Sequence, residues 1–92
     1  MPQLVFLTLF LGLTSGMNSI ALKATPEVRS IRIQLGGRTV VALAHSPWSA
    51  PVDFGPELTP TELVAIGYDA QGQEIARASQ IVNLPRSANN SD

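Results

Sequence analysis

The chain has 92 residues, a formal net charge of −1 and 45% hydrophobic residues, which allows one domain with a modest core. Its six Lys and Arg residues are spread along the sequence, without the basic stripe and interleaved aromatic residues typical of nucleic-acid binding. Cysteine is absent, which excludes disulfides, thiolate metal sites and thiol catalysis.

Residues 4–13 (LVFLTLFLGL) form the most apolar run and are too short to span a bilayer, which takes about 20 residues. Two interpretations of the segment 1–16 compete. As a secretory signal peptide it has a suitable apolar length and a small-x-small site at Ser19-Ile20-Ala21, but no Lys or Arg precedes it. As a first strand it is rich in β-formers. Removing the first twenty or so residues would leave about 70, fewer than the about 100 of an immunoglobulin-type sandwich.

Residues 17–85 are expected to form the domain itself. Residues 18–24 alternate, with Ile20 and Leu22 on one side, and the sequence Thr25-Pro26-Glu27 ends that strand. Residues 29–35 and 38–44 predict a hairpin around the turn Gly36-Gly37, with Ile31, Ile33 and Leu35 facing inward.

A second hairpin is predicted over residues 61–84. Its turn is Asp69-Ala70-Gln71-Gly72, where the Asp carboxylate can accept hydrogen bonds from the turn and Gly supplies a positive φ. Tyr68 is expected in the core. Between the hairpins, residues 45–48 form a corner and Val52 and Phe54 carry a short strand, while the polar residues 86–92 are expected to be a disordered tail or linker.

No catalytic arrangement is visible around the single histidine, His45, because no serine lies in a nucleophile-elbow motif. The carboxylates lack calcium-ligand spacing, being isolated at Asp53, Glu57, Glu62, Asp69 and Glu74. The sequence therefore predicts a non-enzymatic domain without a metal or other cofactor.

Three side chains are candidates for binding a ligand or protein partner: Trp48, Arg32 and Arg38. Trp48 is the only tryptophan and is interpreted first as a core side chain, with a platform for stacking a sugar as the alternative. Arg32 and Arg38 lie on the first hairpin, whose strand edges could accept another strand and whose charges could limit that pairing.

The string P-W-x(3)-V-D-F-G-P-E-L-x-P from Pro47 to Pro60 is followed by L-V-A-I-G-Y-D-A-x-G-x-E-I-A-R-A from Leu63 to Ala78. In this order the two resemble bacterial immunoglobulin-like domains that accompany von Willebrand factor type A (VWA) modules in exported proteins. The resemblance covers about residues 28–86, and departs from the family at Gly36, where Asp is usual, and at Thr61, where His is common.

The resemblance implies a small all-β, immunoglobulin-like antiparallel β-sandwich of six to seven short strands. It also implies a structural or protein-interaction module of an exported multidomain protein, of which this chain could be a truncated part. The expected partners are neighbouring domains of the same or another chain, contacted through sheet edges, with weak self-association and no nucleic acid. The alternative is a small carbohydrate- or ligand-binding module that uses Trp48. The favoured location is extracytoplasmic (periplasmic, cell-surface or secreted), with a cytoplasmic one left open.

Overall fold

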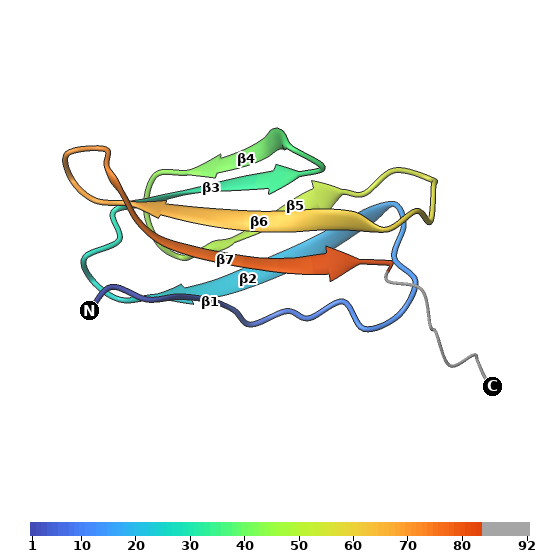
Figure 1. The fold of residues 1–92 in the computed structure, drawn as a ribbon, viewed down its shortest axis with the longest axis horizontal. Helices are drawn as coiled ribbons and strands as arrows, with labels where there is room; N and C mark the ends of the chain where they lie inside the picture. The colour runs from blue at the N-terminus through green and yellow to red at the C-terminus, as the bar shows by residue number, and fades with distance from the viewer. Residues whose placement is uncertain (84–92) are drawn as a thin grey trace.

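Two antiparallel β-sheets pack face to face around a shared apolar core (Figure 1). The computed structural model describes residues 1–83, and the predicted tail 86–92 lies outside the described residues. The strands are β1 (Leu4–Phe6), β2 (Met17–Ala24), β3 (Ser30–Leu35), β4 (Arg38–Leu43), β5 (Ser49–Asp53), β6 (Thr61–Tyr68) and β7 (Glu74–Val82). The described residues hold no helix, and so none that could cross a membrane.

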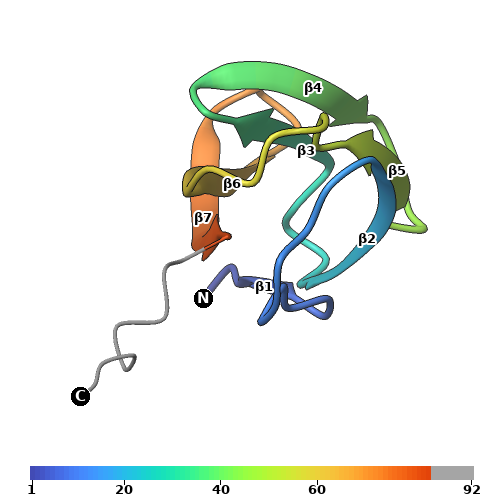
Figure 2. The same ribbon diagram turned by 90° about the vertical axis from the view of Figure 1, so that its right-hand side faces the viewer.

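One sheet has the strand order β1-β2-β5, and the other has the order β4-β3-β6-β7 (Figure 2). Both predicted hairpins are confirmed, as β3–β4 and β6–β7. They join through the pairing of β3 with β6, in which Ile33 lies opposite Ala65, and this long-range pairing completes the four-stranded sheet. The predicted all-β sandwich of seven short strands is therefore confirmed.

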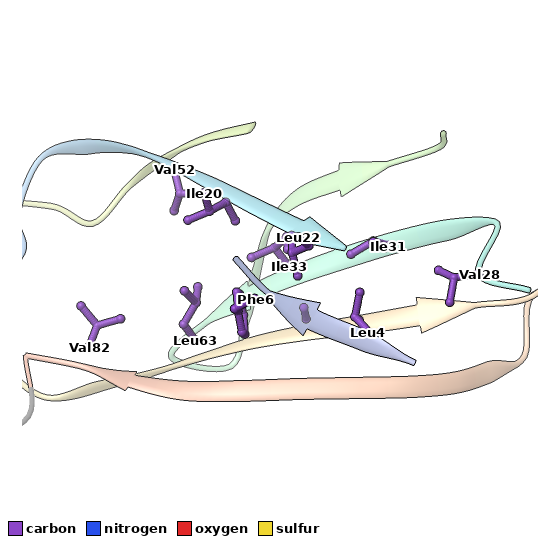
Figure 3. Packing of buried hydrophobic residues seen from close by; sticks show 11 residues of the cluster. Leu4, Phe6, Ile20, Leu22, Val28, Ile31, Ile33, Val52, Leu63 and Val82 are labelled. Atoms are coloured by element: carbon purple, nitrogen blue, oxygen red, sulfur yellow. The ribbon is translucent and has the colours of Figure 1, made fainter. Parts of the chain in front are cut away.

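The core is built from one face of each sheet (Figure 3). Alternate residues of a strand point to opposite faces, and so the inward positions of β2, β3 and β6 supply aliphatic side chains at period two. The largest fully buried side chains are Ile20, Ile31, Ile33, Val52, Leu63 and Val82. The inward faces predicted for residues 18–24 and 29–35 are confirmed.

The two hairpin turns follow the predicted chemistry. Gly36 and Gly37 both have positive φ, at 60° and 86°, a backbone conformation that a two-residue hairpin turn needs and that glycine adopts without steric cost. In the second turn one carboxylate oxygen of Asp69 accepts hydrogen bonds from the amides of Gln71 and Gln73, each 2.9 Å long. Gly72 there has a φ of 81°, as its position in the sequence predicted.

Two local predictions were wrong. Tyr68 does not belong to the core, because Leu63 and Ala65 occupy the inward positions of β6 and Tyr68 has the opposite phase. The third strand of the smaller sheet covers Ser49–Asp53, earlier than the predicted Val52–Phe54, since residues 17–21 of β2 pair along its whole length.

Candidate functional site

Trp48 lies at the end of the loop that joins β4 to β5. Its carbonyl accepts a hydrogen bond of 2.8 Å from the amide of Leu22, which continues the pairing of β2 with β5 by one residue. The side chain is partly buried and packs against the edge of the core. Trp48 is thus a core-edge side chain with a face that reaches the surface.

A hollow of about 650 Å³ opens beside Trp48 at this end of the sandwich, and we call it the Trp48 hollow. Three pieces of chain enclose it: the end of β2, the turn that leads into β3 and the β4–β5 loop. It is lined by Leu22, Lys23, Ala24, Thr25, Pro26, Val28, Arg29, Ala44, His45, Ser46, Pro47 and Trp48. The lining therefore combines apolar side chains with Lys23, Arg29 and His45.

The loop beside the hollow is held by its own hydrogen bonds. His45 Nδ1 lies 2.9 Å from the carbonyl oxygen of Ser46, which leaves Nε2 as the ring nitrogen free of that contact. The amide of Val28 donates to the carbonyl of Thr25 and the amide of Arg29 to the carbonyl of Tyr68. Hydrogen bonds thus hold both sides of the Trp48 hollow, through the His45 side chain in the β4–β5 loop and through main-chain groups in the β2–β3 turn.

The other two predicted binding residues lie elsewhere. Arg32 is exposed on the outer face of the four-stranded sheet, with its guanidinium carbon 5.4 Å from the centre of the Tyr68 ring, a cation–π distance. Arg38 begins β4, at the end of that strand opposite the loop of Trp48, and lines a smaller hollow of about 230 Å³ with Phe54 and Glu57. The structure does not bring Trp48, Arg32 and Arg38 together.

A row of exposed aliphatic side chains runs along the N-terminal segment, which we define as residues 4–14. The row, called the aliphatic row below, consists of Val5, Leu7, Leu9, Leu11 and Leu13, which are between 50% and 81% exposed. On the other side of the same backbone Leu4 and Phe6 are buried in the core, and the ring of Phe10 meets that of Phe54 edge-on at 5.0 Å. The apolar run therefore has one buried side and one exposed side. Its alternation at period two could have predicted this arrangement, which the sequence analysis did not consider.

The side-chain amides of Gln80, in β7, and of Asn83, directly after it, hold the N-terminal segment in place. The Gln80 Oε1 accepts a hydrogen bond from the amide of Phe10, and its Nε2 donates to the carbonyl of Thr8, both at 3.0 Å. Asn83 makes the same pair of bonds to the amide and the carbonyl of Thr14. These side chains supply the hydrogen bonds that main-chain groups of a paired strand would otherwise make. The segment therefore lies along β7 without a ladder of main-chain hydrogen bonds.

Three exposed charged groups have perturbed pKa values. Hydrogen bonds from Arg77 lower the pKa of Glu74 and raise that of the guanidinium, in an exposed pair 2.9 Å long. Its own backbone amide and Thr25 lower the pKa of Glu27. Within residues 1–83, no three His, Asp or Glu side chains gather in a group that could hold a metal ion.

Comparison with known proteins supports the fold alone. No protein-family model matches the chain, and no curated protein matches its sequence. Solved structures of "Clostridium thermocellum CbhA fibronectin(III)-like modules" include a chain that is similar to this one with a TM-score of 0.72. The match covers 86% of this chain and 92% of that chain at 10% sequence identity. The chain thus has a fibronectin(III)-like variant of the immunoglobulin-like β-sandwich fold.

Proposed function

We propose that this chain is a non-enzymatic structural or protein-interaction module of an exported, VWA-associated multidomain bacterial protein. The observation that carries the proposal is the aliphatic row. In this proposal the row is the surface that contacts a neighbouring domain of the same or another chain. Its five side chains are 50–81% exposed on a backbone anchored to the sandwich. Soluble proteins rarely leave large contiguous apolar patches uncovered unless the patch binds something.

The charge pattern supports a protein partner for the aliphatic row. Residues 1–22 contain no Lys, Arg, Asp or Glu, and the first charged side chain is Lys23. Charged side chains are a common device by which exposed edges avoid pairing with other chains. Their absence along the N-terminal segment leaves its outer side open to another apolar surface.

The proposal includes retention of the segment 1–16 as part of the fold. The small-x-small site at Ser19-Ile20-Ala21 lies inside β2, and the side chain of Ile20 is completely buried. Cleavage there would remove β1 and half of β2, together with the core side chains Leu4 and Phe6. A signal peptide is normally removed without such damage, because it is not part of the mature fold.

The exported, VWA-associated setting rests on the sequence resemblance over residues 28–86. The likeness to a solved chain among "Clostridium thermocellum CbhA fibronectin(III)-like modules" is compatible with it. An extracytoplasmic location belongs to the same proposal and has the same support.

The contact surface is tested by the double variant Leu9→Gln/Leu11→Gln, with Ile81→Gln as the control. Ile81 is 48% exposed on β7, outside the aliphatic row. We expect the unmodified chain to self-associate weakly in sedimentation velocity at high concentration, and the double variant to do so at least about tenfold less. Burying one leucine contributes about 1.5–3 kcal/mol, and 1.4 kcal/mol is tenfold in affinity. A chain that neither self-associates nor binds a hydrophobic dye would contradict the proposal. An equal loss of self-association in Ile81→Gln would contradict it as well.

Retention and export are tested by the intact mass of the chain produced in a bacterial host with its own N-terminus. We expect the mass of the complete chain, whether it is recovered outside or inside the cytoplasm. A mass that lacks about twenty N-terminal residues, the length of a typical signal peptide, would overturn retention and with it the role of the aliphatic row. Recovery of the complete chain from the cytoplasm alone would leave the exported setting without support from this chain.

A further inference from the structure

The Trp48 hollow differs from the rest of the surface in its charge. Two of the six Lys and Arg residues, Lys23 and Arg29, line it together with His45, the single histidine. None of the six Asp and Glu residues within residues 1–83 is among its lining residues, although the chain as a whole has a net charge of −1. A concave surface with charges of one sign concentrates ligands of the opposite sign.

These cationic groups are not neutralised inside the protein. Among residues 1–83 the only ion pair joins Arg77 and Glu74, on β7. The acidic residue closest in sequence to the hollow is Glu27, which is not among the lining residues and forms no ion pair with Lys23 or Arg29. Lys23 and Arg29 therefore keep their hydrogen-bond donors for an anion from outside.

The apolar part of the lining indicates the rest of the ligand. Trp48 is fixed against the core edge, and Pro47 and Val28 also line the hollow. A pyranose ring carries C–H groups on its faces, which pack on an indole, and polar groups around its rim. The volume of about 650 Å³ falls within the range of small-molecule sites, roughly 300–1,000 Å³.

We propose that the Trp48 hollow binds a carboxylate-bearing saccharide, with a uronate carboxylate held by Lys23 and Arg29 and a pyranose face against Trp48. This site is separate from the aliphatic row and goes beyond the proposed interaction function. Arg29 is suited to a carboxylate because its planar guanidinium can donate two parallel hydrogen bonds. The hydroxyl of Ser46 and Nε2 of His45 are at hand for the ring hydroxyls.

An acidic peptide is the less favoured ligand. A peptide that binds in an extended form usually adds a strand to a free sheet edge. Two edge strands, β4 and β5, end beside the hollow, and the second of them has Pro51 in its middle, without an amide hydrogen to donate. Strand addition is thus obstructed at the edge of β5, whereas a saccharide needs only side-chain contacts.

The test is a fluorescence titration of the full chain, because Trp48 is the only tryptophan and its emission reports on the hollow alone. The probes are a galacturonic acid trimer, a neutral maltotriose and a glutamate-rich hexapeptide. We expect saturable binding of the uronate trimer, weakened by added salt, and binding of maltotriose at least about tenfold weaker. No saturable change with the uronate trimer at millimolar concentration, or equal binding of either other probe, would overturn the proposal.

The residues are tested with Arg29→Gln and Lys23→Gln, and with Arg38→Gln as the matched control. Arg38 is an equally exposed basic side chain at the opposite end of β4 and outside the hollow. Each hollow variant is expected to weaken uronate binding about fivefold to tenfold with an unchanged melting temperature, since each loses hydrogen bonds to a charged group on an exposed surface. Equal weakening by Arg38→Gln would show non-specific charge attraction and reject the site.

Discussion

At Gly67 the backbone of β6 passes close to the side chain of Val28, in the chain that enters β3. A Cβ atom added there would lie 3.1 Å and 3.3 Å from the two methyl carbons of Val28, which is itself buried. Both distances are shorter than ordinary van der Waals contact, and the core around Val28 has little room to yield. Glycine is therefore required at this position because a larger side chain would collide with Val28, and not because of the backbone angles.

Gly67→Ala is accordingly expected to lower the free energy of unfolding by about 1–3 kcal/mol through overpacking. The control is Gly12→Ala, where a Cβ would meet nothing within 4 Å. That change should be neutral or stabilise by up to about 1 kcal/mol, because alanine restricts the unfolded chain. Urea unfolding measures both. The explanation fails if Val28→Ala does not recover part of the loss when it is combined with Gly67→Ala.

Asn83 combines two demands on one residue. It is buried, its φ is 62°, and its side-chain amide serves both the amide and the carbonyl of Thr14. Asparagine is among the few residues other than glycine that tolerate this backbone region, and here it also closes the N-terminal segment onto the end of β7.

Substitution at Asn83 can separate these two demands. Asn83→Gly keeps the backbone conformation but leaves Thr14 without its partners, and we expect a loss of about 1–3 kcal/mol in the free energy of unfolding. Asn83→Ala should lower the free energy of unfolding by about 1–2 kcal/mol more, because alanine, unlike glycine, is destabilised in a left-handed backbone conformation. Equal urea midpoints for the two variants would contradict the role of the left-handed backbone at residue 83. An unchanged midpoint for Asn83→Gly would contradict the role of the hydrogen bonds to Thr14.

At the scale of an element, the N-terminal segment runs like a strand but makes few of the main-chain hydrogen bonds of a sheet. Only Leu4–Phe6 pairs with β2 as a regular strand. Beyond it the segment lies alongside β7, fastened at Thr8, Phe10 and Thr14 by Gln80 and Asn83. A few side-chain contacts thus decide whether the aliphatic row is displayed on a fixed backbone.

Hydrogen exchange can test the role of Gln80 in this arrangement. In Gln80→Met the amide of Phe10 loses its acceptor, and we expect that amide to exchange about tenfold faster or more, since two hydrogen bonds of about 0.5–1.5 kcal/mol each disappear. The amides of β6 should keep their protection, because their partners in β3 and β7 are untouched. Gln71→Met, in the exposed turn, is the control. Equal exchange at Phe10 in both variants would mean that another contact holds the segment.

The sequence was informative about elements whose cause is local. The turns at Gly36-Gly37 and Asp69–Gly72 and the alternation of residues 30–35 depend on neighbours within a few positions, and all three were predictable. The pairing of β3 with β6 was not, because it joins residues about 30 positions apart through main-chain bonds that any side chain permits. Tyr68 was misplaced for a related reason. Both faces of β6 carry apolar residues, and periodicity alone does not say which face meets the other sheet.

The candidate sites depended even more on the assembled structure. Trp48 was identified by its rarity, and the structure places it beside a hollow. Lys23 and Arg29 line the same hollow because the chain that leads from β2 to β3 lies beside the β4–β5 loop there. Arg32 and Arg38 were chosen as charges on one hairpin, and they face different parts of the surface. Charges gather on a surface through tertiary contacts, which neither spacing nor composition records.

At the scale of the whole molecule, the smaller sheet depends on its first strand. Residues 1–16 bring β1 and the core side chains Leu4 and Phe6, and without them β2 becomes an open edge beside an uncovered core. Burying two such side chains contributes about 3–6 kcal/mol. That is comparable with the whole stability of a domain of this length, which at about 0.05–0.15 kcal/mol per residue amounts to roughly 5–14 kcal/mol.

Deletion of residues 1–16 is therefore expected to lower the urea midpoint steeply or to abolish cooperative unfolding, as followed by Trp48 fluorescence. A peptide of residues 1–16 added in trans should restore part of the midpoint, because its buried side, with Leu4 and Phe6, fits the site it left. The full-length variant Val5→Gln/Leu7→Gln is the control, since both side chains are exposed and should be dispensable for stability. A truncated chain with an unchanged midpoint would show that the sandwich stands without its first strand. The signal-peptide interpretation would then be the better account of the apolar segment, and the aliphatic row would lose its role as a contact surface.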